Sequence, residues 1–352
     1  MKAIRVDASR RYEVEIERGL LDRAGELLRG ATRAEKAMLV TGANVGPLYA
    51  ARVGLSLEKA GFTVTFVPVP AGEGAKSLEV YARVLDAAAA AQMSRSDVFV
   101  ALGGGVTGDL TGFAAATWQR GADFAQIPTT LLAMVDSSVG GKTALNLTSG
   151  KNQVGAFYQP CAVLCDPDTL RTLPEREYRA GCAEVLKYGL LGDAAFFEAL
   201  VNTPVREQEE TVIAHCVAMK RDIVHRDEFD RGERQKLNLG HSFGHAIEAC
   251  SGYAVLHGEA VAAGLALMAR AAAAKGYCTA ETAERTLDAL RLYGLPTETD
   301  FSAEALENVL AADKKRQGGV MKLVVPRAIG RCELVPVPLG ELGDWLRAGG
   351  LS

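Results

Sequence analysis

Short runs rich in β-branched residues alternate with alanine-rich stretches through the first half of the chain. The runs have the length of buried strands, and the stretches between them carry apolar residues at helical spacing. Repeated strand–helix–strand units predict a mostly parallel sheet with helices on both faces. The expected strands are Met38–Thr41, Thr63–Val67, Val98–Leu102, Phe124–Ile127 and Ala162–Cys165, and the expected helices are Leu48–Ala60, Leu78–Ala91 and Leu131–Val139.

The chain changes character after about Asp166, where long alanine-rich segments of helical period take over. A length of 352 residues is enough for about two domains, so we expect an α/β domain over 1–166 and a mainly helical domain over 167–352. A cleft between two domains is the default place for a ligand. The further helices are expected at Tyr178–Leu200, Val205–Val224, Lys236–Ala249, Gly258–Ala274, Ala280–Leu292, Ser302–Ala311 and Leu339–Leu346, and hairpins at Ile4–Val6 with Tyr12–Ile16 and Val320–Val325 with Arg331–Val335.

Composition limits the setting and the partners of the chain. A formal net charge of −4, from 39 basic and 43 acidic side chains, gives no general attraction to nucleic acid or to an anionic membrane. The longest apolar stretches, such as Val261–Ala269, are far shorter than a membrane span, and from the polar sequence that follows the first residues we expect no signal peptide. Seven scattered cysteines without a CxxC pair indicate reduced thiols. We therefore expect a cytoplasmic protein without a nucleic-acid or membrane partner.

A glycine-rich turn follows the strand expected at Val98–Leu102. The sequence Gly103-Gly104-Gly105-Val106-Thr107-Gly108-Asp109 leads from that strand into a helix and fits the G-x-G-x-x-G pattern. Glycines allow a phosphate to approach the backbone, and the N–H groups at a helix start favour an anion. The turn departs from the dinucleotide fingerprint because it is not the first strand–helix turn and because Asp123 precedes a strand. We favour phosphate binding over the alternative, a tight turn that serves helix packing.

A second polar run lies beyond this helix. Hydroxyls, glycines and lysines are concentrated in Pro128–Lys142 and again in Gly150-Lys151-Asn152. Each lysine alone would be interpreted as a solvated surface charge. Lys142 and Lys151 stand in glycine contexts within ten residues, which favours anion binding, and Asp136 is close enough in sequence to share a site with Lys142.

Three of the five histidines fall within seventeen residues. His241 and His245 are four apart, which on a helix places both rings on one face, and His257 follows. Imidazole with a carboxylate is a common catalytic zinc set, so the cluster predicts a divalent metal site. The sequence HSFGH lacks the glutamate of HExxH, which argues against peptide hydrolysis. The spacing leaves open which histidines bind, and the candidate carboxylates are Glu184, Glu248 and Glu259.

Cations accumulate in the same part of the sequence. Lys187 follows Glu184 by three residues, Arg234 precedes Asn238 by four, and Lys220 lies on the helix expected between them. Such a gathering on a chain of negative net charge suggests an anionic substrate. The alternative is a set of solvated helix faces, which is how Lys314 and Lys315 alone would be interpreted.

Taken together, these motifs resemble the 3-dehydroquinate synthase family. The match runs from about Thr41 to Val324, and the blocks in this order are highly specific although each one alone is weak. The matching blocks are Gly103–Phe113, Arg120-Gly121, Pro128–Lys142, Gly150–Pro160, Leu170–Pro174, Gly181–Gly189, Leu237–Glu248 and His257–Ala260.

The resemblance implies a fold and an activity. The fold would be a Rossmann-like nucleotide-binding α/β domain followed by a mainly α-helical metal-binding domain, in a homodimer. The enzyme would be a lyase of the shikimate pathway, on the route to chorismate and the aromatic amino acids. It would convert 3-deoxy-D-arabino-heptulosonate 7-phosphate into 3-dehydroquinate and phosphate with NAD and zinc, or cobalt in place of zinc. NAD would take a hydride, phosphate would be eliminated, and the hydride would return before an internal aldol closure.

The resemblance also implies roles for single residues. Glu184, His241 and His257 would be the metal ligands, His245 would lie near the substrate, and Arg120 would reach across the dimer interface. Cofactor contacts would be made by Asn44, Glu73, Lys76, Gly104, Gly105, Asp109, Thr129, Thr130, Lys142, Lys151, Thr172 and Glu177. The substrate would be surrounded by Asp136, Lys142, Asn152, Lys187, Lys220, Arg234, Asn238 and Lys315.

The chain departs from the family pattern in two places. Many relatives carry an acidic residue where this chain has Gly42, and an acidic group there would bind the ribose hydroxyls that distinguish NAD from NADP. Gln153 stands where a leucine or methionine is usual. The alternatives are another sugar-phosphate cyclase, a metal-dependent polyol dehydrogenase, and a non-catalytic NAD- or metal-binding module. Arg234 and the intact Gly150-Lys151-Asn152 block favour a carboxylate-bearing substrate.

Overall fold

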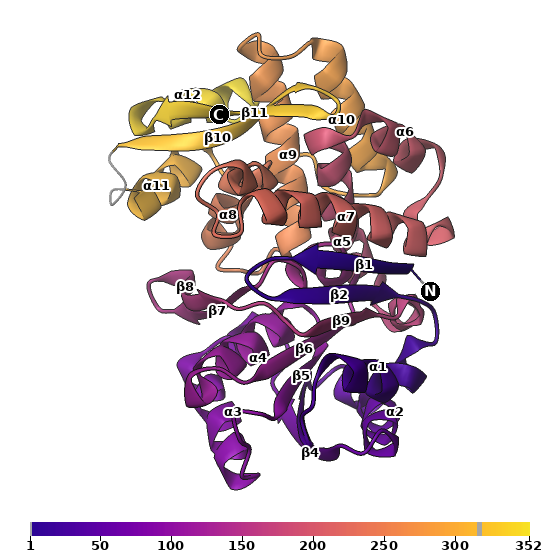
Figure 1. Cartoon of the computed structure of the whole chain (residues 1–352). Helices are drawn as coiled ribbons and strands as arrows, with labels where there is room; N and C mark the ends of the chain where they lie inside the picture. Colours follow the sequence, from indigo (N-terminus) through magenta and orange to yellow (C-terminus); the bar gives the residue numbers. More distant parts are fainter. Residues whose placement is uncertain (1, 315–318) are drawn as a thin grey trace. The chain divides into compact units, whose positions relative to one another are not determined.

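The computed structural model describes the backbone of residues 2–314 and 319–352 and the side chains of residues 2–311 and 319–352. The chain forms two compact units, one of Met1–Leu173 with Glu209–Phe229 and one of Pro174–Gln208 with Asp230–Ser352. Figure 1 shows that the first is an α/β unit and that the second is mainly helical, so the predicted fold class is confirmed. Lys315, predicted to lie beside the substrate, falls outside the described residues.

A seven-stranded sheet forms the centre of the first unit. Its strands lie in the order β1-β2-β9-β6-β5-β3-β4, parallel from β2 to β4, with β1 antiparallel to β2. Each of these strands contains a run that the sequence predicts. The strands are β1 (Lys2–Asp7), β2 (Arg11–Ile16), β3 (Lys36–Gly42), β4 (Thr63–Val69), β5 (Val98–Gly103), β6 (Asp123–Pro128) and β9 (Ala162–Cys165).

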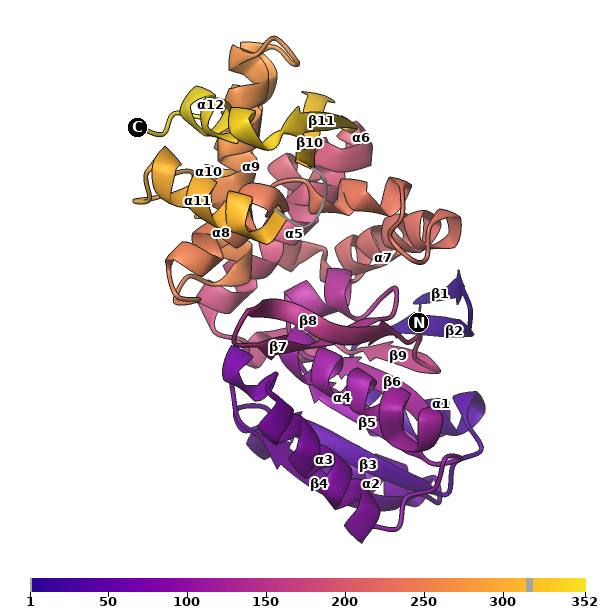
Figure 2. The same ribbon diagram turned by 90° about the vertical axis from the view of Figure 1, so that its left-hand side faces the viewer.

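Alternate residues of this sheet face two separate cores. On β3, Ala37 and Leu39 face one core and Met38 and Val40 face the other, as the two-residue period of a strand requires. Helices α1 and α2 cover the first core and α3 and α4 the second, as Figures 1 and 2 show. Burial on both faces explains why β3 and β5 are continuous apolar runs. The helices are α1 (Ala24–Ala31), α2 (Gly46–Lys59), α3 (Leu78–Ala90) and α4 (Gly105–Thr117).

The segment after β6 differs from the prediction. The helix expected over 131–139 is a π-helical turn, Ala133–Ser137, and a hairpin of β7 (Lys142–Leu147) and β8 (Gly150–Phe157) follows it. The sequence analysis missed this hairpin because β8 is rich in glycine and polar residues and buries little apolar surface.

Helix α7 (Glu209–Arg226) belongs to the first unit, although the predicted boundary at residue 166 assigned it to the helical domain. It packs on β1, β2 and the π-helical turn, and it buries Val212, Ile213 and Val217. The period of a helix shows that it has an apolar face but not which element that face covers. For this reason the sequence could not assign α7 to a unit.

Helix α9 lies at the centre of the second unit and packs against α5, α8, α10 and α12. The single helix expected over 178–200 is two helices, because the side chain of Asp193 accepts a hydrogen bond from the Phe196 N–H and begins a new helix there. The predicted late hairpin is confirmed. The elements are α5 (Glu175–Gly192), α6 (Ala194–Asn202), α8 (His241–Cys250), α9 (His257–Ala274), α10 (Ala280–Leu292), α11 (Ala303–Lys314), β10 (Val320–Ala328), β11 (Arg331–Pro338) and α12 (Leu342–Ala348).

Across the described residues, no helix combines the length and the apolar character needed to cross a membrane. All seven cysteines are free thiols, and four of them are buried.

Candidate active site

The predicted cofactor contacts of the first unit follow the carboxyl ends of its parallel strands. In open α/β sheets, ligands bind at this edge. Residues that are far apart in the sequence are therefore gathered at one edge of the sheet. They are Asn44 after β3, Glu73 and Lys76 after β4, Gly104 and Gly105 after β5, Thr129 and Thr130 after β6, and Thr172 after β9.

The glycine-rich turn joins β5 directly to α4. A Cβ atom on Gly104 would lie 3.1 Å from Cγ2 of Thr130, and one on Gly105 would lie 2.9 Å from Oγ of Ser137. Glycine at both positions therefore lets the start of α4 lie close to the chain that follows β6 without displacing the side chains of Thr130 and Ser137. The N–H groups of the first helical turn carry partial positive charge, which favours an anion such as a phosphate.

Lys76 joins three predicted site residues at this edge. Its side chain is buried, and its Nζ donates to Oδ2 of Asp109 at 2.7 Å and to Oδ1 of Asn152, and lies 3.6 Å from Oε1 of Glu73. Burial raises the pKa of the Asp109 carboxyl, and the Lys76 charge opposes that rise. Lys151 also approaches the group, with Nζ 4.0 Å from Oε1 of Glu73. The structure thus assembles five residues that the resemblance assigns to cofactor or substrate.

Asp136 and Lys220 form a second contact between predicted residues of the first unit. Asp136 lies in the π-helical turn and Lys220 on α7. The Lys220 Nζ donates to the backbone carbonyl of Asp136 at 2.6 Å and forms an ion pair with its carboxylate. π-helical turns are frequent at functional sites, and here the turn presents a carboxylate to a buried lysine.

Three candidate metal-ligand side chains converge in the second unit. Glu184 lies on α5, His241 begins α8 and His257 begins α9. The Nε2 atoms of His241 and His257 each lie 3.2 Å from Oε1 of Glu184, whose side chain is fully buried. A carboxylate oxygen with two imidazole nitrogens is a donor set that suits zinc. The structure brings His241 and His257, the two histidines that the resemblance indicates, into this group.

Gly258 lets the start of α9 reach this group. A Cβ atom on Gly258 would lie 1.9 Å from the carbonyl oxygen of Ala180 on α5. The two helix backbones are therefore in contact at this point. The contact places His257, the neighbouring residue, beside Glu184.

Opposing charges set the protonation states of the cluster. Burial alone would raise the pKa of the Glu184 carboxyl, but Lys187, with Nζ 2.6 Å from Oε2, and His241 outweigh it and hold that pKa well below its usual range. Burial alone would lower the pKa of His257, but its contacts with Glu184 and Glu248 raise it to about 10. Without a metal, the two carboxylates therefore favour the protonated ring of His257, and a metal ion that binds Nε2 takes the place of that proton beside the ionised Glu184.

The Nδ1 atoms of both histidines face hydrogen-bond acceptors. Nδ1 of His241 lies 3.1 Å from the carbonyl oxygen of Leu239, and Nδ1 of His257 lies 3.1 Å from Oε2 of the buried Glu248. A neutral imidazole carries one N–H, so donation from Nδ1 leaves the Nε2 lone pair of each ring for a metal. A second group of His245, Glu248 and His257 also has ligand atoms within 4.8 Å of one another, and it shares His257 with the first group.

The remaining predicted residues differ in exposure. Lys187 and Arg234 are each 1% exposed, unusually low for charged side chains. Asn238 is partly buried and lies three residues before His241, the first residue of α8. The exposed members are Asn44, Arg120, Lys142, Asn152, Thr172, Glu177 and His245. Arg120 has a left-handed backbone with a φ of 70°, as has its neighbour Gln119 at 46°.

Asn146 contacts the Lys76 group and was missed by the sequence analysis. Its side chain donates from Nδ2 to Oε1 of Glu73 at 2.9 Å and accepts at Oδ1 from the backbone N–H of Asn152, also at 2.9 Å. Asn146 lies in the unpredicted hairpin, between the polar blocks Pro128–Lys142 and Gly150–Asn152. An isolated asparagine gives no signal of a role without the partners that the fold supplies.

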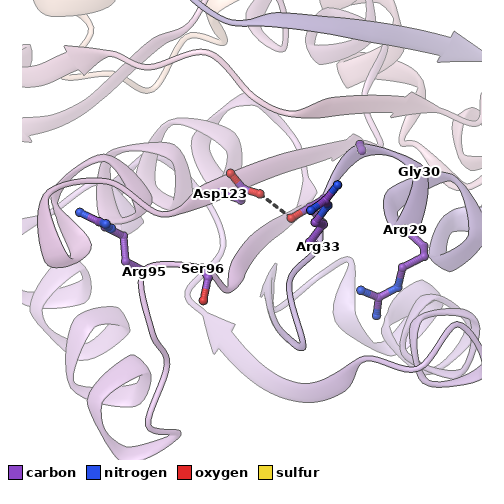
Figure 3. A pocket seen from close by; sticks show the side chains of 8 residues that line it. Arg29, Gly30, Arg33, Arg95, Ser96 and Asp123 are labelled. Atoms are coloured by element: carbon purple, nitrogen blue, oxygen red, sulfur yellow. Dashed lines mark hydrogen bonds between the residues drawn. The ribbon is translucent and has the colours of Figure 1, made fainter.

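A hollow of about 460 Å³ lies at the amino ends of the strands of the first unit. Figure 3 shows Arg29, Arg33, Arg95 and Asp123 around it. Asp123 is already paired there, with Oδ1 2.9 Å from an Arg10 nitrogen. Within the described residues no predicted site residue lines this hollow, so it is separate from the candidate site at the carboxyl ends.

Comparison with known protein families gives two matches that adjoin. A model described as 3-dehydroquinate synthase N-terminal matches residues 66–180, and one described as 3-dehydroquinate synthase C-terminal matches residues 181–316. The chain is also 47% identical over 336 residues to the curated 3-dehydroquinate synthase of Caulobacter vibrioides (strain NA1000 / CB15N), with 91% of each chain covered.

Two solved structures are similar over almost the whole chain. One is 2-epi-5-epi-valiolone synthase from Streptomyces hygroscopicus subsp. jinggangensis 5008 with NAD⁺ and Zn²⁺ bound, at 30% identity and a TM-score of 0.88. The other is 2-deoxy-scyllo-inosose synthase complexed with carbaglucose-6-phosphate, NAD⁺ and Co²⁺, at 25% identity and a TM-score of 0.87. Each match covers 98% of this chain and 99% of the chain in the solved structure.

Proposed function

Because the chain belongs to the 3-dehydroquinate synthase family, we propose that it converts 3-deoxy-D-arabino-heptulosonate 7-phosphate into 3-dehydroquinate and phosphate. It is a lyase that acts in the shikimate pathway. The observation that carries the proposal is the convergence of Glu184, His241 and His257 in a chain that matches this family along most of its length.

Glu184, His241 and His257 would hold a zinc or cobalt ion. The donor set is right for either metal, and the Leu239 carbonyl and Glu248 hold the two rings by their other nitrogen. The valiolone synthase with Zn²⁺ and the inosose synthase with Co²⁺ support this assignment.

NAD would bind at the carboxyl edge of the seven-stranded sheet. The close backbone approach at Gly104 and Gly105 leaves the first turn of α4 open to a phosphate, and the NAD⁺ in both similar structures supports the assignment. When bound, NAD would accept and later return a hydride at a secondary alcohol of the substrate, and the metal ion would polarise the oxygen of that alcohol.

The protein's own cations would hold the two acidic groups of the substrate. Lysine and arginine bind phosphate and carboxylate through charge-assisted hydrogen bonds, and the planar guanidinium of Arg234 suits a carboxylate in particular. Lys187 has a second task, because its contact with Glu184 keeps that carboxylate ionised and able to bind a metal. Asp136 would orient Lys220 toward the substrate, since it contacts the Lys220 ammonium through both its carbonyl and its carboxylate.

We propose in addition that the enzyme works as a cytoplasmic homodimer in which Arg120 extends to the partner's substrate. The side chain of Arg120 is exposed, and its backbone is left-handed, as is that of Gln119. This unusual backbone suits a residue whose side chain has to extend in one direction, away from its own chain.

A comparison of substrates tests the proposal against its rivals. The enzyme, with NAD and zinc, is offered the heptulosonate phosphate and, separately, glucose 6-phosphate, which has no carboxylate. We expect NMR to show 3-dehydroquinate from the first and no cyclic product from the second. Cyclisation of glucose 6-phosphate alone would indicate another sugar-phosphate cyclase, and steady NADH formation from a simple polyol would indicate a dehydrogenase.

A further inference from the structure

Asn146 occupies an irregular position in the β7–β8 hairpin. The strands pair Leu145 with Val154 and Leu147 with Gly150, so the ladder shifts register at Asn146 and leaves its backbone unpaired in the ladder. Its backbone N–H donates instead to the carbonyl oxygen of Lys76 at 2.7 Å. Irregularities of this kind redirect a side chain and are common beside active sites.

The side chain of Asn146 completes a closed ring of polar contacts. Asn146 donates to Glu73 and accepts from the backbone of Asn152, while the side chains of Glu73 and Asn152 both contact the Lys76 ammonium. Asn152 has a left-handed backbone with a φ of 55°, a region that asparagine adopts more readily than most residues other than glycine. Its N–H donates to Asn146 from this conformation.

We propose that Asn146 is a positioning residue that holds Glu73, Lys76 and Asn152 in the arrangement that NAD and the sugar phosphate require. The inference rests on the proposed function for the ligands and on the contacts for the role. An amide is required because it donates to a carboxylate and accepts from an N–H at the same time. Asn146 touches neither ligand directly in this account; it acts through its three neighbours.

The role of Asn146 is tested by exchanging its amide with the carboxylate of Glu73, a pair of substitutions that leaves the net charge unchanged. In Asn146→Asp, two carboxylates would face each other at positions 146 and 73, so the ring should open. In the double variant Asn146→Asp/Glu73→Gln, the new glutamine amide can donate to the new aspartate, which still accepts from the Asn152 N–H. A double-mutant cycle isolates this coupling from the separate effect of each change. Thr148→Ala, an exposed position in the same hairpin, is the matched control.

Two readouts are measured on the full-length protein. We expect Asn146→Asp to weaken NAD binding about tenfold, the size typical of a lost hydrogen bond to a charged group, but to weaken it less than threefold when Glu73→Gln is already present. Hydrogen exchange at the Asn152 amide should accelerate in Asn146→Asp and return toward the wild-type rate in the double variant. Equal effects of Asn146→Asp in both backgrounds, or unchanged exchange, would overturn the inference.

Comparing the wild-type protein with the variants separates this inference from the proposed function. A wild-type protein that binds no NAD would contradict the proposed function, and it would also overturn the role proposed for Asn146. Normal NAD binding and turnover without the predicted rescue would contradict the positioning role alone. The Asn146→Ala variant extends the test, because it removes the side-chain contacts without adding a charge.

Discussion

His257 contacts two carboxylates through its two ring nitrogens, and the two carboxylates have different tasks in our account. Glu184 meets Nε2, together with His241, and would share a metal ion with both rings. Glu248 meets Nδ1 and would hold the ring in the tautomer that leaves Nε2 unprotonated. The distinction gives each carboxylate a separate experimental signature.

Substituting Glu248 should weaken the metal site without removing a ligand. We expect Glu248→Gln to lower zinc affinity about tenfold and Glu248→Leu to lower it up to about a hundredfold, because the ring loses its orienting partner. Competition with a chromophoric chelator measures the affinity, with Glu284→Gln, an exposed position on α10, as the control. Wild-type affinity in Glu248→Leu would rule out the role, and loss of one of two bound ions would make Glu248 a ligand of a second site.

Removing His257 should remove the metal and leave the fold. Loss of a residue that only supports a ligand costs up to roughly a hundredfold in metal affinity. We expect His257→Ala to lower zinc affinity by more than that, because it removes a ligand, and to abolish activity. Three helices with their own apolar packing carry the ligands, so the far-ultraviolet circular dichroism should stay unchanged. Elemental analysis after dialysis measures the metal, and wholesale unfolding of the variant would show that the site is structural.

Residue spacing could indicate a metal site here but could not choose its ligands. His241 and His245 share a helix face, and both have ligand atoms close to other candidates. The choice depends on where Glu184 and Glu248 lie, and these positions are set by the packing of α5, α8 and α9. The resemblance to a family supplied the ligand set that the spacing left open, and the structure brings that set together.

At the scale of elements, the metal cluster depends on contact between helix backbones. Gly258 places the start of α9 against Ala180 of α5, and Gly264 brings α9 equally close to α8, where a Cβ would lie 2.1 Å from the Gly240 carbonyl oxygen. Larger residues at these points would separate the helices that carry Glu184, His241 and His257.

We expect Gly258→Ala to destabilise the protein by about 1–3 kcal/mol, the usual range for overpacking, although alanine is otherwise the better helix former by about 1 kcal/mol. Zinc affinity should fall as well, because His257 moves with the helix start. Urea unfolding and chelator competition measure the two effects. Gly340→Ala, where a Cβ would meet nothing within 4 Å, is the control. A stabilised variant with normal zinc affinity would contradict the argument.

The elements that could be predicted are those with a strong apolar period. The buried parallel strands and the long helices of the second unit follow from it, while the β7–β8 hairpin does not, because its strand β8 is polar and rich in glycine. That hairpin nevertheless carries Lys142, Asn146 and Asn152. Polar segments at functional sites are selected for contacts with a ligand, so their local pattern is a poor guide to their structure.

At the scale of the whole molecule, the two units divide the chemistry. The first gathers the proposed cofactor contacts at the carboxyl edge of its sheet, and the second holds the proposed metal ligands on α5, α8 and α9. Neither unit carries a complete set of the residues that the proposed reaction requires. The chain therefore has to be tested as a whole.

The proposed homodimer is tested by molecular mass in solution. The chain has a mass of 37.3 kDa, so we expect light scattering behind a sizing column to give about twice that value. Arg120→Ala should preserve this mass and NAD binding while it lowers turnover, because the residue would act on the partner's substrate. A monomer that turns over normally would contradict both the assembly and the role of Arg120.

The central claim is that the enzyme uses NAD without consuming it. The most direct measurement follows inorganic phosphate and NADH together during turnover of the heptulosonate phosphate with NAD and zinc. We expect one phosphate to be released for each substrate consumed and no NADH to accumulate at 340 nm. NADH formed in step with substrate consumption, or no phosphate released, would contradict it.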